Sequence, residues 1–188
     1  MTAASANSVT SASSVRITSG EFRGRRLVVP RAGTHPMGDR EKLALFNTLG
    51  PLSDTERVLD CYCGSGALGL EALSRGALAA VFVDRDVSAV SDNIRALGVE
   101  DRTEIIKLKI TASTTDKIPG VFDLIFIDPP YDAFSAADFA PLASHLAAHG
   151  RLVLSHPETI DPKLLFKGLI YQKTKKFARC HLSFYKKV

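Results

Sequence analysis

Residues 58–67 read Val-Leu-Asp-Cys-Tyr-Cys-Gly-Ser-Gly-Ala, and this stretch decides the fold. The short apolar run that begins at Arg57 ends in the carboxylate of Asp60, and a glycine-rich turn then leads into a segment of helical spacing, 67–75. Because glycine has no side chain, a ligand can approach the backbone of such a turn and the amino end of the following helix. The stretch therefore predicts a strand, a turn and a helix, with a ligand site at the turn.

Short apolar runs continue to alternate with helical spacing along the chain, which is typical of βα repeats and a parallel sheet. We expect strands at 57–60, 80–83, 104–110, 122–127 and 151–154, and a hairpin formed by 169–177 and 181–187. The expected fold is α/β and Rossmann-like. It is a doubly wound, mostly parallel sheet of seven strands, in which one strand of the C-terminal hairpin is antiparallel.

The first helix is expected over residues 39–49. The carboxylate of Asp39 can cap its amino end, and Leu43, Phe46 and Leu49 fall on one face. Further helices are expected at 67–75, in the segment that ends near Leu97, and in the Ala- and Leu-rich segment before the fifth strand. The helical segments alternate with the strands, as a doubly wound sheet requires.

A second carboxylate, Asp84, comes 24 residues after Asp60 and ends the next strand. In a doubly wound sheet it faces the same crevice, where a carboxylate can accept both hydroxyls of a ribose. Gly64, Gly66 and Gly69 spell the dinucleotide pattern GxGxxG, but the Asp60 carboxylate would repel a diphosphate. The combination favours a nucleoside cofactor that carries a cation, namely S-adenosylmethionine, over NAD.

The motif Asp128-Pro129-Pro130-Tyr131 directly follows an apolar strand. The two prolines fix the backbone and supply no N–H, so the turn is rigid and its carbonyls are free to accept hydrogen bonds. Asp128 and the Pro129 carbonyl can hold the two hydrogens of an exocyclic amino group and turn its lone pair toward a methyl donor. Tyr131 offers a flat face on which an extruded base can stack.

The charge of the chain is unevenly distributed. The 188 residues hold 24 Lys and Arg against 20 Asp and Glu, a net charge of +4. Residues 1–40 hold six arginines against two acidic residues, and residues 161–188 hold eight basic residues against one, so the middle of the chain is acidic. The basic ends are either solvated faces or a surface that binds a polyanion.

Several classes of protein are excluded by composition. No run of about 18 apolar residues occurs, so we expect no membrane span. Residues 1–14 hold no charge and no apolar signal core, so we expect a disordered, low-complexity tail. Three cysteines, two of them in Cys61-Tyr62-Cys63, favour reduced thiols over disulfides or a metal site, and we expect a cytoplasmic protein with no metal.

Together the two motifs resemble those of class I S-adenosylmethionine-dependent methyltransferases that modify an amino nitrogen. Over nearly all of residues 15–187 the chain is similar to the RsmD family, bacterial guanine-N2 methyltransferases of small-subunit ribosomal RNA. The resemblance rests on Arg16-Ile17 with Gly20, on Arg23-Gly24-Arg25-Arg26-Leu27 with Pro30, on Asp39-Arg40 with Leu45-Phe46-Asn47, on the stretch from Gly64 to Gly76, and on Asp128-Pro129-Pro130-Tyr131.

The resemblance implies the roles of individual residues. The cofactor would be S-adenosylmethionine, with Asp60 and the turn 64–66 around its methionine part and Asp84 on its ribose. The cofactor-binding residues we expect are Asp60, Cys61, Gly64, Ser65, Gly66, Asp84, Arg85 and Thr111. Asp128, Pro129, Pro130 and Tyr131 would hold the target guanine as the catalytic group. Arg16, Arg23, Arg25, Arg26 and Arg40 would bind RNA.

The expected activity is methylation of the N2 amino group of a guanine in 16S rRNA, within an assembling or assembled 30S subunit, by a monomer. A basic arm, 15–38, would precede the methyltransferase domain, 39–188. Two other functions stay open: an amino methyltransferase acting on another RNA or on DNA, and a non-catalytic RNA-binding relative.

The chain departs from the family pattern at three places. His35-Pro36-Met37-Gly38 stands where the family reads Arg-Pro-Thr, and Ile110-Thr111-Ala112-Ser113 stands where an acidic residue is common. Phe177-Ala178-Arg179-Cys180 replaces Tyr-Gly-Asp-Thr. These departures concern the adenine contacts and part of the RNA contacts.

Overall fold

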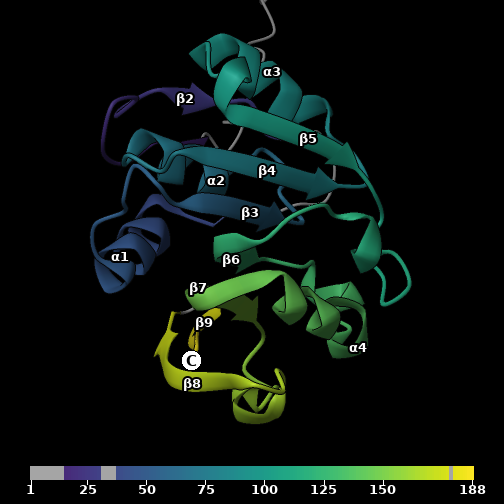
Figure 1. Cartoon of the computed structure of the whole chain (residues 1–188). Helices are drawn as coiled ribbons and strands as arrows, with labels where there is room; N and C mark the ends of the chain where they lie inside the picture. The colour runs from purple at the N-terminus through teal and green to yellow at the C-terminus, as the bar shows by residue number, and fades with distance from the viewer. Residues whose placement is uncertain (1–14, 31–36, 178–179) are drawn as a thin grey trace, which may run out of the picture.

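A computed structural model describes residues 15–30, 37–177 and 180–188. Within these residues the main sheet has seven strands in the order β5-β4-β3-β6-β7-β9-β8 (Figure 1). The strands are β3 (Arg57–Cys61), β4 (Ala79–Asp84), β5 (Thr103–Lys107), β6 (Phe122–Ile127), β7 (Leu146–His156), β8 (Leu169–Lys176) and β9 (His181–Lys187). Only β9 runs antiparallel to its neighbours, so the predicted fold class is confirmed.

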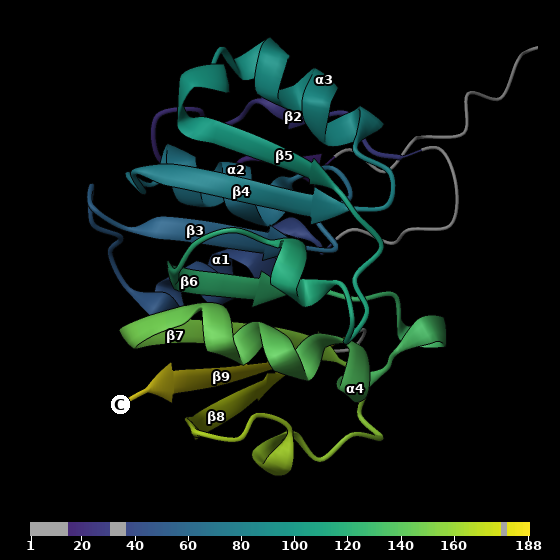
Figure 2. The same ribbon diagram turned by 45° about the vertical axis from the view of Figure 1, so that its right-hand side comes forward.

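The two faces of the sheet carry different elements (Figure 2). One face is covered by α1 (Asp39–Leu49), α2 (Ala67–Ser74) and α3 (Ser88–Leu97), with the small pair β1 (Val15–Arg16) and β2 (Arg26–Leu27). The other face packs against α4 (Ala136–Phe139) and the 3-10 turns η2 (Thr115–Lys117), η4 (Ala140–His145) and η5 (Pro162–Leu164). Two further 3-10 turns are η1 (Glu100–Arg102) and η3 (Tyr131–Ala133).

Side chains on β4 alternate between the two faces, as the pleat requires. Phe82 packs into the core beneath the three α-helices, whereas Val81 and Val83 pack toward α4. All three side chains are buried. Such apolar burial on both faces is typical of the central strands of a parallel sheet. The order in which the strands are added reverses between the parallel neighbours β3 and β6.

The segment before α1 is tied to the helices by one buried carboxylate, Glu71 of α2. It accepts hydrogen bonds from Thr18 N (2.7 Å), Thr18 Oγ1 (2.7 Å) and Ser19 N (3.1 Å). It also pairs with Arg75 Nε at 2.8 Å and with the buried Lys42 Nζ at 3.5 Å. These contacts fasten the segment to α1 and α2, and we call the five residues the Glu71 cluster.

Two predictions about α1 are wrong although its bounds are right. Asp39 does not cap the helix: its Oδ2 pairs with Arg16 Nη2 at 3.0 Å, and the residue at the cap is Gly38. Leu43 does not face the core, since it is 44% exposed. Phe46 is buried as predicted, but the residues buried with it are Leu45 and Lys42.

Two other elements are shorter than predicted. Strand β5 ends at Lys107 instead of Ile110, because its partner β4 ends at Asp84, whose carbonyl accepts the last bond, from Leu108 N. The helix predicted between the fourth and fifth strands is only the four-residue α4, which passes into η4. Pro141 lies in the first turn of η4 and supplies no N–H to an α-helix. The predicted tail, 1–14, lies outside the described residues.

Candidate active site

Three predicted carboxylates lie at the carboxyl ends of three neighbouring strands. Asp60 is in β3, Asp84 ends β4 and Asp128 directly follows β6. These strands are adjacent and parallel, in the order β4-β3-β6, so their carboxyl ends share one edge of the sheet (Figure 2). We call this edge the carboxyl edge. It includes the point where the sheet order reverses, which is where ligands bind in open α/β sheets.

Asp60 is buried, with 1% of its surface exposed. Its Oδ2 accepts a hydrogen bond from Gly69 N at 2.8 Å, which holds the carboxyl group against α2. Burial raises the pKa of Asp60 well above its usual value; the Gly69 bond opposes this, and the charges of Asp128 and Asp84 add to it. The edge therefore gathers negative charge in a poorly solvated place, which favours a cationic ligand and disfavours a diphosphate.

Asp84 is half-buried, and its carboxylate organises the turn after β3. Oδ2 accepts from Gly64 N at 2.9 Å and Oδ1 from Asp86 N at 3.2 Å. A carboxylate has about four acceptor positions, so each oxygen keeps one for a ligand hydroxyl. Asp84 can therefore hold the glycine turn and bind a ribose at the same time.

The three glycines of the GxGxxG pattern, two in the turn and Gly69 in α2, have different tasks. A Cβ at Gly66 would lie 2.5 Å from Val90 Cγ2, and one at Gly69 would lie 2.4 Å from Phe82 Cε1. These two positions are small because α2 packs closely on α3 and β4. A Cβ at Gly64, where φ is +51°, would meet nothing within 4 Å. Gly64 is therefore the position at which a ligand can reach the backbone.

For the other predicted cofactor-binding residues, the structure gives fewer contacts that point to a ligand at the carboxyl edge. The side chain of Cys61 is buried in the core, so only its backbone lies at the edge, and its carbonyl accepts from Asp128 N at 3.4 Å. Ser65 is buried and its carbonyl accepts from Asn93 Nδ2 at 2.8 Å. Arg85 is exposed beside Asp84. Thr111 follows β5 in the next loop, where its N–H bonds to Thr114 Oγ1 at 2.8 Å.

The motif from Asp128 to Tyr131 leaves β6 at the same edge. Burial raises the pKa of Asp128, and a hydrogen-bonding contact with Ser155 opposes that rise. Pro129 is buried and Pro130 is exposed, and the carbonyl of Pro130 accepts from Ala133 N at 3.2 Å. Tyr131 is 36% exposed, with its hydroxyl 2.6 Å from Ser155 Oγ. The structure thus brings the predicted acceptor and the predicted stacking ring together.

Two residues at this site were not found from the sequence. Ser155 of β7 contacts both Asp128 and Tyr131. Cys180 lies near them, since burial and the nearby charges of Asp128 and Glu41 raise its pKa to about 12, against a hydrogen-bonding contact with Tyr131. A usable signal for Ser155 was its place directly after the apolar run 152–154, because polar residues at strand ends reach the same edge.

The five arginines predicted to bind RNA do not form one patch; all five are exposed. Arg16 pairs with Asp39 at the amino end of α1, near the carboxyl edge, and its Cα partner across β1 and β2 is Arg26. Arg40 lies one residue further along α1. Arg25 donates to Ala96 O (2.6 Å) near the end of α3, so it lies at the opposite edge of the sheet, and Arg23 is in the same loop.

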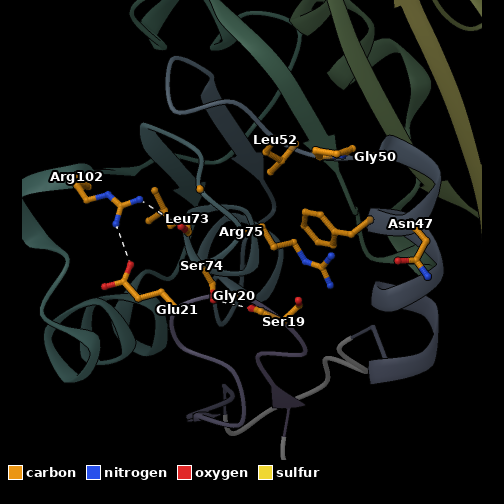
Figure 3. Close-up of a pocket in the computed structure, with 13 residues that line it drawn as sticks. Ser19, Gly20, Glu21, Asn47, Gly50, Leu52, Leu73, Ser74, Arg75 and Arg102 are labelled. Atoms are coloured by element: carbon orange, nitrogen blue, oxygen red, sulfur yellow. Dashed lines mark hydrogen bonds and ion pairs between the residues drawn. The ribbon is translucent and has the colours of Figure 1, made fainter.

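A cavity of about 700 Å³ lies at the opposite, amino edge of the sheet, between α1, α2 and the loop that carries Gly20 and Glu21 (Figure 3). Its charged groups are already paired. Arg102 bonds to Glu21 and to the Leu73 and Ala77 carbonyls, and Arg75 to Glu71. This cavity is remote from the three carboxylates and adds nothing to the candidate site.

The departures from the family pattern fall only partly in the described residues. His35 and Pro36, like Ala178 and Arg179, lie outside them. In the loop 110–113, Ala112 N bonds to Asp138 Oδ1 of α4 at 3.4 Å. An acidic side chain from another element therefore reaches the loop that itself has none.

The chain is similar to known proteins over most of its length. The family model described as conserved hypothetical protein 95 matches residues 15–186. YlbH of Bacillus subtilis (strain 168) is 31% identical over 92% of this chain and 99% of that protein. Ribosomal RNA small subunit methyltransferase D of Escherichia coli (strain K12) is 37% identical over 62% of this chain and 60% of its own length.

A solved structure also matches most of the chain. The Escherichia coli protein yhhF has a TM-score of 0.79 and 28% identity, and the match covers 93% of this chain and 98% of that one. In the described residues, no helix is both long enough and apolar enough to cross a bilayer.

Proposed function

This chain belongs to the family described as conserved hypothetical protein 95, the RsmD-type methyltransferases, and we propose that it methylates the N2 amino group of a guanine in 16S rRNA. The observation that carries the proposal is the shared edge at which the glycine turn, Asp84 and the motif from Asp128 to Tyr131 meet. One part of this edge fits a nucleoside cofactor, and the other fits a flat base with an amino group.

The residues present fit S-adenosylmethionine. Asp84 has acceptor positions left for the ribose hydroxyls, and the open space at Gly64 admits a ligand to the backbone. Asp60 and its acidic neighbours favour a positively charged group. When bound, this cofactor supplies a methyl group activated by a sulfonium. Cys61, Ser65, Gly66, Arg85 and Thr111 complete the proposed cofactor site, with Cys61 acting through its backbone.

The proposed base-binding part begins where the cofactor part ends. Asp128 and the carbonyl of Pro129 accept the two hydrogens of the guanine amino group, which directs its lone pair away from the ring. Pro130 keeps this turn rigid, and the ring of Tyr131 stacks on the base. Asp128 acts as a hydrogen-bond acceptor first and accepts a proton only after transfer, because the amino group is acidic only once methylated.

The proposed RNA surface has two parts. Arg16, Arg26 and Arg40 lie toward the carboxyl edge and would contact phosphates near the target base. Arg23 and Arg25 lie at the other edge and would contact a more distant part of the RNA. We propose residues 15–38 as an arm that precedes a methyltransferase domain formed by residues 39–188, in a monomer that acts in the cytoplasm on the 30S subunit.

The test has two steps. Titration calorimetry should show binding of S-adenosylmethionine and no binding of NAD; absence of cofactor binding would contradict the enzyme proposal. Labelled methyl transfer should then be measured with naked 16S rRNA, 30S particles and duplex DNA. Mass analysis of the digested RNA should find N2-methylguanosine. Transfer to another base or to DNA would replace the proposed substrate, and binding of RNA without any transfer would indicate a non-catalytic relative.

The two parts of the RNA surface can be separated by salt dependence. Replacing Arg40 by Ala should lower the slope of log affinity against log salt by about one unit and also reduce methyl transfer. Replacing Arg23 by Ala should lower the slope equally but leave the transfer rate at saturating RNA unchanged. An unchanged slope in both variants would show that these arginines are only solvated.

A further inference from the structure

Ser155 lies beside the base-binding motif because of the register between β6 and β7. Ile127, the residue before Asp128, has Leu154 as its Cα partner, so the next residues along the two parallel strands are Asp128 and Ser155. Ser155 is 2% exposed. A hydroxyl in such a place needs a partner within the protein, since an unpaired buried polar group is costly.

The partners of Ser155 are the two functional side chains of the motif. Its Oγ lies 2.6 Å from the hydroxyl of Tyr131, a short hydrogen bond for two hydroxyl groups. It also makes the contact that favours the charged form of Asp128. Ser155 therefore connects the carboxyl group of Asp128 to the ring of Tyr131. The backbone of the motif already links these two residues, and Ser155 adds a link between their side chains.

The direction of the hydrogen bonds follows from the inventory of protons. An ionised carboxylate can only accept, and serine and tyrosine each have one hydroxyl proton. If Ser155 donates to Asp128, its lone pairs remain to accept from Tyr131. The reverse arrangement would leave a buried carboxylate facing an oxygen without a proton. The favoured chain runs from Tyr131 through Ser155 to Asp128.

The other groups around Asp128 cannot replace Ser155. Asp60 of β3 interacts with Asp128 as a like charge. Cys180 faces both Asp128 and Glu41 of α1, and burial keeps this thiol protonated. Among the described residues, Ser155 is therefore the side chain whose contact favours the charged form of Asp128.

We propose that Ser155 is a positioning residue of the methyltransferase site. It accepts a hydrogen bond from Tyr131 and donates one to Asp128, and in this way fixes the stacking ring relative to the carboxylate that receives the amino group. The role rests on the proposed function. It predicts that loss of the Ser155 hydroxyl impairs the chemical step more than substrate binding, because the base would still stack but in a less uniform orientation.

The test is a double-mutant cycle with Ser155→Ala and Tyr131→Phe, in which each variant removes one end of the same hydrogen bond. Each change should lower kcat about tenfold and alter KM for RNA less than threefold, and the double variant should be no slower than the slower single variant. The acid limb of the kcat profile should move to higher pH in Ser155→Ala, because the carboxylate form is required and its pKa would rise. Ser155→Thr should restore both properties.

A matched control is Ser183→Ala in β9. Ser183 is also buried, hydrogen-bonds His156 and Thr174, and is the Cα partner of Leu154, but among the described residues none of its hydrogen bonds goes to the motif. It should leave kcat and the pH profile unchanged. Additive effects in the cycle, or an acid limb that does not move, would overturn the proposal.

A measurement without turnover separates this proposal from the proposed function. Titration of the Asp128 carboxyl carbon by NMR should show a higher pKa in Ser155→Ala than in the wild type, and no change in Ser155→Thr or Ser183→Ala. If the wild type transfers no methyl group to RNA, the function fails while this titration still decides the contact. An unchanged pKa in Ser155→Ala would overturn the contact itself.

Discussion

Glu71 and Asp60 are both buried carboxylates, but their surroundings are opposite. Glu71 pairs with two cations and accepts three hydrogen bonds from Thr18 and Ser19. Asp60 accepts one backbone hydrogen bond, and its charged neighbours are other carboxylates. The comparison teaches how to distinguish a structural buried charge from a functional one: the protein itself satisfies the first, and it leaves the second with acceptor capacity for a ligand.

The largest effect is expected in the Glu71 cluster. Glu71→Leu leaves Lys42 buried without its closest carboxylate and should cost about 3–5 kcal/mol. For a chain of this size, that lowers the melting temperature by roughly 10 °C. Thermal unfolding followed by circular dichroism measures it, with Lys42→Met added to recover part of the loss. If the melting temperature fell by less than about 2 °C, Glu71 could not be called a structural carboxylate in contrast to Asp60.

Replacing Asp128 should have the reverse effect, a large loss of activity without a loss of stability. Asp128→Asn replaces one acceptor oxygen by a donor, which faces the amino group of the substrate, and should reduce methyl transfer by about 100-fold or more. The melting temperature of the variant should stay equal to that of the wild type or rise, because a partly buried charge is removed. Radiolabel transfer and thermal unfolding are measured on the same preparation. Loss of stability comparable to that of Glu71→Leu would place Asp128 with the structural group.

Asp84 tests the cofactor part of the carboxyl edge. Asp84→Asn keeps an acceptor for Gly64 N but loses charge-assisted bonds to the ribose, each of which is worth about 1.5–3 kcal/mol. Calorimetry should therefore show binding of S-adenosylmethionine weakened by about 10-fold to 100-fold. Asp92→Asn, an exposed carboxylate on α3, is the control. Equal affinity in both variants would show that Asp84 only organises the turn.

Replacing Asp60 should change the stability of the fold least, and the direction of that change with pH follows from its raised pKa. Burial raises its pKa, so the folded chain keeps this proton at pH values where the unfolded chain, with the ordinary value of 3.8, has released it. Stability therefore falls as the pH rises through that window. Asp60→Asn does not titrate, so at neutral pH it should be more stable by about 1 kcal/mol, or roughly 2–4 °C. Melting curves from pH 4 to pH 8 should diverge as the pH rises; parallel curves would contradict the sign.

Periodicity and turn residues in the sequence predicted the bounds of several strands and helices. The strand 122–127 and the helix 39–49 have the bounds that periodicity and punctuation indicated. The carboxylates at strand ends were also foreseen, because parallel strands must present their carboxyl ends together. The positions of Asp60, Asp84 and Asp128 therefore followed from the alternation of strands and helices, before any contact was known.

The contacts that the sequence did not reveal join residues far apart in the chain. Asp39 looked like a helix cap, but it pairs with Arg16, 23 residues earlier. Ser155 reaches Tyr131 only because β6 and β7 are in one particular register. No periodicity encodes such pairings, since each side chain satisfies the local pattern equally well without its partner. They required the assembled sheet.

The Glu71 cluster has a consequence for synthesis of the protein. Thr18 leaves the ribosome 53 residues before Glu71, its acceptor, which at about 5–20 residues per second is an interval of roughly 3–10 seconds. During that interval Thr18 and Ser19 lack their acceptor, and of the ion pairs that the structure describes in this segment only Arg16–Asp39 can form. Docking of the segment therefore requires that α2 has emerged, so it cannot precede the synthesis of α2 although the segment itself is made first.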